Sequence, residues 1–139
     1  MSLVDSILGH DGQLFPPVDE TRLAQLTEQA QRRLGLALPD DYLDFLRRSN
    51  GACVDGVILY PAASFRQEAM ELPGVIEINL SRRQARPGLR HLLILGEFDD
   101  DYLLYQPAEF RRVDRISLDR WDAAPTLGRL VTQLLDSLG

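Results

Sequence analysis

The chain has 139 residues, of which 45% are apolar and 26% charged, and its formal net charge is −6. A chain of this length and composition is expected to form one globular domain that buries its core without a metal or a disulfide. These numbers argue against a membrane-spanning protein, because no apolar run approaches ~20 residues, and against an internal disulfide, because Cys53 is the single cysteine.

The charge balance indicates what kind of partner the chain would bind. All 15 basic residues are arginine, and acidic residues outnumber them. An acidic surface repels nucleic-acid phosphates and attracts basic partners, so we expect a protein partner and neither nucleic acid nor membrane. The opening residues, MSLVDSILGHDG, lack the basic segment of a signal peptide. Together with the single cysteine, this predicts a cytoplasmic protein.

Two helices are predicted near the N-terminus. Ser2 and Asp5 have the spacing of a capping box, which would start a short helix. The glycines and prolines of HDGQLFPPV then predict a loop. A second helix is expected from about Glu20 to a stop at Gly35. Its apolar stripe consists of Leu23, Leu26, Ala30 and Leu34.

The segment LPDDYLDFLRRSNGA, residues 38–52, predicts a third helix with both ends marked. Pro39 is tolerated at a helix start, and Asp40 and Asp41 place negative charge in the first turn, where the helix dipole favours it. Asn50 and Gly51 would supply a left-handed stop. One apolar face contains Tyr42, Phe45 and Leu46.

The second half of the chain predicts strands. A short apolar run at 56–61 indicates a buried strand, whereas 75–86 fits either a strand or a helix that ends before Pro87. Three further runs, joined by short connections, predict an antiparallel meander: 91–96, 101–106 and 110–117. In the last run Phe110 and Ile116 share a phase that Val113 does not, so a bulge is needed to restore one face.

The closing segment gives the strongest helical periodicity of the chain. Pro125 stands near its start, and its apolar positions are Leu127, Leu130, Val131, Leu134, Leu135 and Leu138. Helices, then a sheet, then a helix predict the α+β class: an antiparallel meander with helices packed against it, in a single domain over residues 1–139.

The segment at 38–52 resembles the hallmark of the SUKH superfamily, which includes the yeast cell-wall assembly regulator family. In that family a Leu-Pro pair, an aromatic residue, a Phe-Leu pair and an Asn-Gly-Gly end recur in this order. The matching positions are Leu38, Pro39, Tyr42, Phe45, Leu46, Asn50 and Gly51. Ala52 stands where a second glycine is usual. LLILGEFDDDYLLYQ resembles the family's strand, acidic turn and strand, and RISLDRW with LGRLVTQLL its last strand and closing helix.

The resemblance covers residue 20, approximately, to the end of the chain. It implies a SUKH-type binding domain without catalysis or cofactor, and it favours the helix at 75–86. In bacteria such proteins are largely immunity proteins that neutralise a cognate toxin, often a nuclease. A regulatory or scaffolding module that binds a host protein is the alternative. The identity of the partner, the strand order and the oligomeric state stay open.

The candidate binding site is the tip of the hairpin between the first two meander strands. Carboxylates in a turn are commonly solvated, but here they could also present phosphate-like charge to a basic toxin. A calcium loop would need a glycine at its sixth position and a glutamate at its twelfth, and neither follows Asp99. The predicted partner-binding residues are Glu97, Phe98, Asp99, Asp100, Asp101 and Tyr102.

Two groups of arginines have structural explanations. The first has no aromatic residue interleaved, as single-stranded nucleic-acid binding would require, so a solvated or internally paired face is expected for Arg82, Arg83, Arg86 and Arg90. The second lies on the strand that pairs beside the acidic turn, so cross-strand ion pairs are expected for Arg111, Arg112 and Arg115.

The remaining reactive residues predict neither a metal site nor a catalytic one. His10 and His91 are too few for zinc, and Cys53 has no neighbour in sequence that would activate its thiol. We expect His91 to be a hydrogen-bonded structural residue. Four aromatic residues are candidates to anchor an interface: Phe98, Tyr102, Tyr105 and Trp121. For Tyr105 and Trp121, the expected alternative is a position in the core beneath the last helix.

Overall fold

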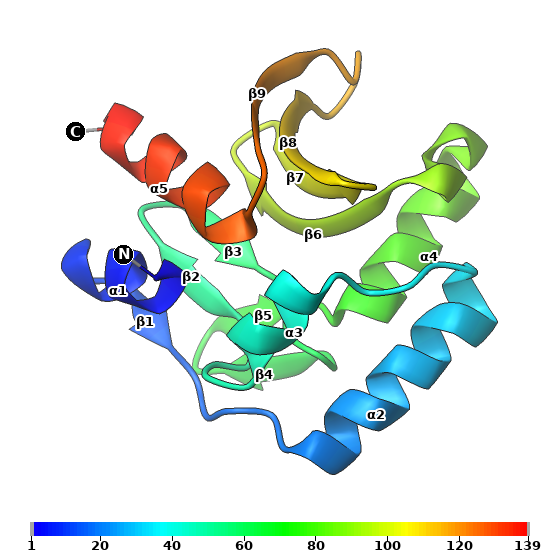
Figure 1. Ribbon diagram of the computed structural model, residues 1–139, viewed down its shortest axis with the longest axis horizontal. Coiled ribbons are helices and arrows are strands. Elements are labelled where there is room, and N and C mark those ends of the chain that lie inside the picture. Colours follow the sequence, from blue (N-terminus) through cyan, green and yellow to red (C-terminus); the bar gives the residue numbers. More distant parts are fainter. Residues whose placement is uncertain (1, 139) are drawn as a thin grey trace.

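The computed structural model describes residues 2–138 and shows one α+β domain in which five helices pack against a seven-stranded antiparallel sheet (Figure 1). The predicted fold class is confirmed. The helices are α1 (Leu3–Gly9), α2 (Glu20–Gln29), α3 (Asp40–Leu46), α4 (Val75–Ala85) and α5 (Leu127–Leu138), with a π-helical turn at Ala30–Leu34 and a 3₁₀ turn at Pro87–His91. The strands are β1 (Gln13–Leu14), β2 (Ala52–Val54), β3 (Val57–Leu59), β4 (Phe65–Gln67), β5 (Met70–Leu72), β6 (Leu93–Phe98), β7 (Asp101–Gln106), β8 (Glu109–Asp114) and β9 (Arg120–Ala124).

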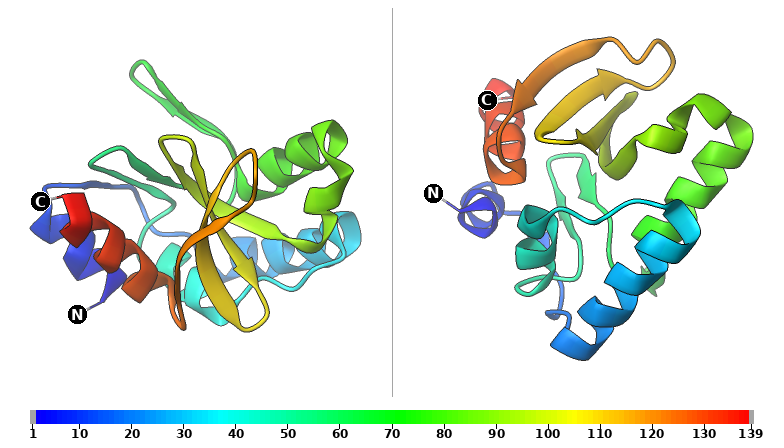
Figure 2. Two further views of the ribbon diagram at one scale, coloured as in Figure 1. Left: turned by 90° about the horizontal axis from the view of Figure 1, so that it is seen from above. Right: turned by 45° about the vertical axis from the view of Figure 1, so that its right-hand side comes forward.

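The sheet has the order β1-β2-β3-β6-β7-β8-β9, and every neighbouring pair is antiparallel. Helices α1 and α5 lie side by side at one end of the molecule, and at the other end α4 packs against the π-helical turn that continues α2 (Figure 1). The β4–β5 hairpin forms a separate two-stranded sheet that projects from the body (Figure 2, left). The predicted meander is therefore the β6–β7–β8 part of a larger sheet.

The first two helices begin and end where local chemistry predicts. The Ser2 hydroxyl accepts a hydrogen bond from the Asp5 backbone N–H, and the Asp5 carboxylate accepts one from the Ser2 N–H, which completes the capping box of α1. Helix α2 continues through the π-helical turn to Gly35, whose φ of 68° is left-handed. The predicted stripe of α2 is buried.

Helix α3 begins after Pro39 as expected, but its predicted stop is wrong. The helix ends at Leu46, and Gly51 lies beyond it, at the entry to β2. Gly51 has a φ of 86°, and a Cβ there would lie 2.8 Å from the Leu59 carbonyl oxygen. Glycine is therefore required at position 51 because β3 approaches closely there, and not because helix α3 ends there.

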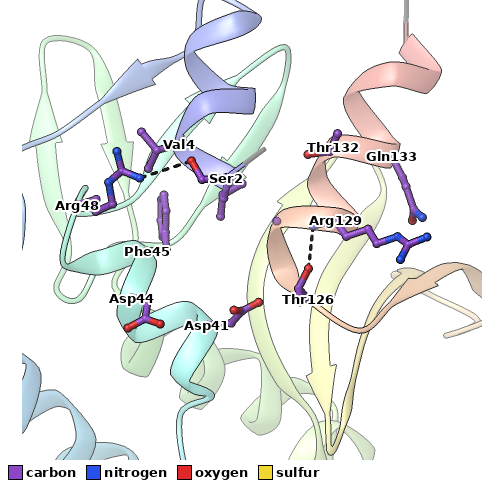
Figure 3. Close-up of a pocket in the computed structure, with 12 residues that line it drawn as sticks. Ser2, Val4, Asp41, Asp44, Phe45, Arg48, Thr126, Arg129, Thr132 and Gln133 are labelled. Atoms are coloured by element: carbon purple, nitrogen blue, oxygen red, sulfur yellow. Dashed lines mark hydrogen bonds between the residues drawn. The ribbon is translucent and has the colours of Figure 1, made fainter.

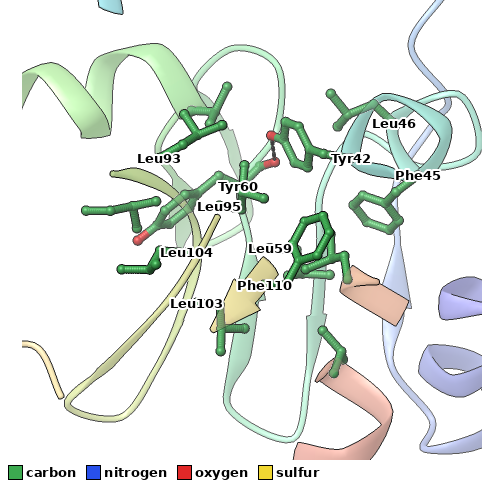
Figure 4. Packing of buried hydrophobic residues seen from close by; sticks show 14 of the residues in the cluster. Tyr42, Phe45, Leu46, Leu59, Tyr60, Leu93, Leu95, Leu103, Leu104 and Phe110 are labelled. Carbon is green, nitrogen blue, oxygen red and sulfur yellow. Dashed lines mark hydrogen bonds between the residues drawn. The ribbon is translucent and has the colours of Figure 1, made fainter. Parts of the chain in front are cut away.

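The apolar face of α3 enters the centre of the core (Figure 4). Tyr42, Phe45 and Leu46 are all buried, and the Tyr42 hydroxyl donates a 2.5 Å hydrogen bond to the carbonyl oxygen of Tyr60. This bond gives the one polar atom of a buried ring a partner. Segment 38–52 therefore forms part of the scaffold.

Segment 75–85 is a helix, and one buried polar side chain fixes it to the sheet. Asn79 is 1% exposed. Its Nδ2 donates to the carbonyl oxygens of Val75 and Ile94, both at 2.8 Å. Its Oδ1 accepts from the Ile94 N–H at 2.9 Å. The side-chain amide therefore bonds both backbone groups of Ile94, as a neighbouring strand would.

Strand β6 needs this partner because β3 covers only half of its length. The pairing of β3 with β6 ends at Leu59 opposite Gly96, after which the Tyr60 N–H still reaches the Leu95 carbonyl oxygen. A bulge in β6 follows between Ile94 and Gly96. A Cβ at Gly96 would lie 2.5 Å from the Ile58 carbonyl oxygen, so only glycine allows this approach of β3.

The end of the predicted meander differs from expectation. The strand predicted for 110–117 ends at Asp114, and it pairs with β7 without a register shift, so the bulge expected within it is absent. The register shift of this region lies in β9, where Trp121 has no partner on β8. Phe110 and Val113 lie on opposite faces of β8, and both are buried. The core position expected for Trp121 is wrong, because its side chain is 65% exposed on the outermost strand.

Several short strands were not predicted. β1, β2, β4 and β5 have two or three residues each, too few for an alternating pattern to appear. The predicted loop at 10–18 accordingly contains β1. Among residues 2–138, each helix is too short or too polar to span a bilayer.

Replacing Asn79 tests the bond between α4 and β6. Asn79→Ala leaves the N–H and the carbonyl of Ile94 without partners in the interior, which we expect to cost about 2–5 kcal/mol in the free energy of unfolding. Urea denaturation measures this loss. Gln84→Ala, an exposed site on the same helix, should change stability by less than about 0.5 kcal/mol. A loss below about 1 kcal/mol for Asn79→Ala would contradict the proposed role.

Replacing Phe45 tests the packing of α3. Because the ring is buried among core side chains, Phe45→Ala should lower the free energy of unfolding by about 3–5 kcal/mol. Asp44→Ala removes an exposed neighbour on the same helix and should cost less than about 1 kcal/mol. Equal losses for the two variants would show that α3 is misplaced.

Candidate functional site

The structure divides the predicted hairpin tip into exposed and buried residues. The β6–β7 turn consists of Asp99 and Asp100, and both are exposed. Asp101, in contrast, is only 8% exposed, and its carboxylate accepts a 2.7 Å hydrogen bond from Arg112 Nε. Tyr102 is 4% exposed. Neither Asp101 nor Tyr102 is available to a partner, which corrects the prediction for these two residues.

The other two predicted residues also face inward. Glu97 is half-buried and accepts a 2.9 Å hydrogen bond from the Tyr60 hydroxyl. Burial, and then the charge of Glu97, raise the pKa of this hydroxyl. Phe98 is half-buried with the Arg112 guanidinium 5.3 Å from its ring centroid. The Phe98 ring packs against the core, so it folds back instead of extending into solvent.

Strand register brings two more turns to the same end of the sheet. Val57 lies opposite Phe98, and Asp101 lies opposite Asp114, so the β2–β3 and β8–β9 turns flank the β6–β7 turn. Figure 2 (left) shows these three turns on one side, while the β7–β8 turn points the other way. We call this surface the acidic turn end, and its carboxylates are Asp55, Asp99, Asp100, Asp114 and Asp119.

Sequence analysis identified two of these five aspartates. Asp55, Asp114 and Asp119 were missed because they are far from the predicted hairpin in the sequence. A strand order would have been needed to find them. Their turns come together only because β3 lies next to β6, and β9 next to β8, in the sheet.

Few cations neutralise the acidic turn end. Arg115 Nη2 lies 3.4 Å from Asp100 Oδ1, and His10 Nδ1 lies 3.4 Å from Asp55 Oδ2. The two arginines of β8 pair elsewhere: Arg112 with Asp101 on β7, and Arg111 with Glu109 on its own strand at 3.0 Å. The predicted cross-strand pair is thus present for Arg112, whereas Arg111 pairs within its strand and Arg115, beyond the end of β8, pairs between two turns.

Asp114 orders the β8–β9 turn. Its Oδ1 accepts hydrogen bonds from the backbone N–H groups of Ile116 and Ser117, at 2.8 and 2.9 Å. The bonds from Ser117 and Ile116 lower the pKa of the Asp114 carboxyl, because they favour its charged form. This turn is therefore held in one conformation by its own side chain.

Two arginines, one in α4 and one just after it, bond to carbonyl oxygens of other segments. Arg83 Nη1 donates to the Leu34 carbonyl at 2.8 Å, and Arg86 Nη1 donates to the Arg115 carbonyl at 3.0 Å. Burial, and then the charge of Arg90, lower the pKa of Arg83. Within residues 2–138, no carboxylate lies within 4.0 Å of the guanidinium nitrogens of these arginines. They join helices to loops, which accounts for part of the expected internal pairing.

A groove of about 710 Å³ lies between α1, α3 and α5 (Figure 3). Val4 and Phe45 line its apolar part. Its polar groups secure helix ends: the Asp41 carboxylate accepts a 2.7 Å bond from the Leu127 N–H, and the Thr126 hydroxyl accepts a 3.1 Å bond from the Arg129 N–H. No histidine or cysteine lines the groove.

The remaining reactive side chains lie apart. Cys53, on β2, is half-buried with its Sγ 3.3 Å from Met70 Sδ, and burial raises the pKa of its thiol. The 3₁₀ turn that carries His91 lies far from β2 (Figures 1 and 2). His91 is exposed, so the expected hydrogen-bonded structural histidine is wrong. Among residues 2–138, no three His, Cys, Asp or Glu side chains are placed to hold a metal ion.

No model of a known protein family matches the chain, and a search of curated proteins gives no significant match.

The reactivity of the Cys53 thiol tests the half-buried position of this side chain. Because burial raises its pKa, little thiolate exists at neutral pH, and the thiolate is the reacting species. We expect the folded protein to react with an aromatic disulfide reagent at pH 8 at least about tenfold more slowly than the urea-unfolded protein. Equal rates would show that Cys53 is open and unperturbed.

Proposed function

We propose that this chain is a non-enzymatic, cytoplasmic protein-binding domain of SUKH type that neutralises a basic toxin by covering its active surface. The resemblance at 38–52 and in the later strands supports the family, and the packing of Tyr42, Phe45 and Leu46 fits a structural role for that segment. The protein-binding role does not depend on the toxin, since a basic host protein would meet the same surface.

The acidic turn end is the observation that carries the proposal. Three turns from separate parts of the chain place aspartates on one surface, and three of these residues, Asp99, Asp114 and Asp119, form no ion pair within 4.0 Å in the described structure. A surface of one charge attracts an oppositely charged partner and speeds association. Carboxylates that resemble the charge of a phosphate backbone would suit a nuclease as the target.

Identification of the partner tests the proposal directly. The tagged chain should co-purify from its native host with one basic protein, identified by mass spectrometry, and should inhibit the activity of that protein when both are purified. A toxin gene next to the gene for this chain would favour immunity over a scaffolding role. A partner that is acidic, or binding that leaves its activity unchanged, would contradict neutralisation by an acidic surface.

Charge removal tests which surface binds. The triple variant Asp99→Asn, Asp100→Asn, Asp119→Asn should weaken the affinity for that partner by roughly tenfold and should flatten its dependence on salt, as calorimetry in two salt concentrations would measure. The matched control, Glu28→Gln, Asp44→Asn, Glu77→Gln, removes the same charge from exposed sites elsewhere. If both triple variants lose affinity equally, net charge and not the acidic turn end is responsible.

A further inference from the structure

The two most exposed large apolar side chains of the described structure belong to one hairpin. Ile116, in the β8–β9 turn, is 80% exposed, and Trp121, on β9, is 65% exposed. Single exposed apolar residues are common on protein surfaces. Tryptophan, however, is among the residues that contribute most to protein interfaces, and this one is the only tryptophan of the chain.

The turn that presents Ile116 is ordered. Besides the two bonds to the Asp114 carboxylate, the Asp114 N–H donates to the Asp119 carbonyl at 2.9 Å, and the Leu118 N–H donates to the Asp114 carbonyl at 2.8 Å. Leu118 adopts a left-handed φ of 63° and packs its side chain against the core. An ordered turn loses little conformational entropy when it binds, so Ile116 is already in a conformation suited to contact.

Trp121 is turned outward by the β8–β9 bulge. Arg112 pairs with Asp122 and Val113 pairs with Arg120, so Trp121 is the residue without a partner on β8. A bulge commonly redirects a side chain in this way. The Asp122 carboxylate also accepts a 2.9 Å hydrogen bond from the Ala123 N–H. This bond occupies a donor that an added strand would need, so side chains are the expected means of contact.

The charges around this hairpin indicate the partner. Asp122 follows Trp121 directly, Asp119 precedes it by two residues, and Asp99 and Asp100 belong to the adjoining turn. The nearby arginines are paired: Arg120 with Glu109 at 3.3 Å, and Arg115 with Asp100. Asp99, Asp119 and Asp122 form no ion pair within 4.0 Å in the described structure, and exposed apolar residues next to such carboxylates are complementary to an apolar patch bordered by lysines and arginines.

The geometry points to the β8–β9 hairpin as the apolar centre of the binding surface, where Ile116 and Trp121 insert into a basic protein partner. This inference rests on the proposed function, since it specifies where that partner docks. If the partner bound through the charge of the acidic turn end alone, removing carboxylates would cost the most affinity. The inference predicts instead that truncating Ile116 and Trp121, which are neutral, costs more affinity than removing charge.

Site-specific photo-crosslinking in the native host tests this surface. A benzoylphenylalanine side chain replaces Ile116, Trp121 or, as a control, Leu8, which is 55% exposed on α1. We expect positions 116 and 121 to give an adduct with one basic protein, the adduct to weaken with Asp99→Asn and Asp100→Asn, and position 8 to give none. Adducts with that protein at position 8 only would overturn the inference while leaving the proposed function intact. No adduct at any position, with no co-purified partner, would overturn both.

Once the partner that crosslinking identifies has been purified, affinity measurements with it complete the test. Trp121→Ala should weaken binding by at least about thirtyfold and Ile116→Ala by about tenfold, whereas Leu8→Ala should change it less than twofold. Binding should also shift the emission of Trp121 to shorter wavelength, because the ring leaves water. Unchanged affinity and emission, in variants that keep the native circular dichroism spectrum, would exclude this hairpin as the docking surface.

Discussion

The fold depends on one amide that completes a strand. Asn79 bonds the N–H and the carbonyl of Ile94 from a helix, at the point where β3 no longer covers β6. Strand β6 can therefore pair with β3 along one half and with α4 along the other, while β7 follows its whole length. This arrangement, with the bulge before Gly96, fixes β3 and β7 on either side of β6. The β2–β3, β6–β7 and β8–β9 turns consequently lie at the same edge of the domain.

The placement of charge follows from the same register. Where acidic and basic side chains face each other across paired strands, they neutralise one another, as Arg112 does for Asp101. Most carboxylates of the turns have no strand opposite them, and Asp99 and Asp119 form no ion pair within 4.0 Å in the described structure. They form an acidic surface at one end of the sheet. The proposed binding function uses that surface and needs no cofactor.

The sequence predicted those elements whose signal is local. Helix α3 and helix α5 have an apolar face at helical spacing and residues typical of a helix start, and both form as expected. The segment at 75–86 was ambiguous because Asn79, a buried polar residue, hides the apolar periodicity of α4. The short strands β1 and β2 were missed for lack of length. Of the predicted binding residues, Asp99 and Asp100 are exposed, while the inward position of Asp101 depends on a salt bridge to another strand. The outward position of Trp121 depends on a bulge whose place the sequence does not specify.

Hydrogen–deuterium exchange on the chain bound to the partner purified from its native host tests the central claim most directly. If the chain acts through the end of the sheet, amides at 98–101 and 114–121 should exchange more slowly in the complex than in the free protein, and those of α4 should be unchanged. Protection confined to the groove between α1, α3 and α5, or the absence of any protected segment, would contradict this account.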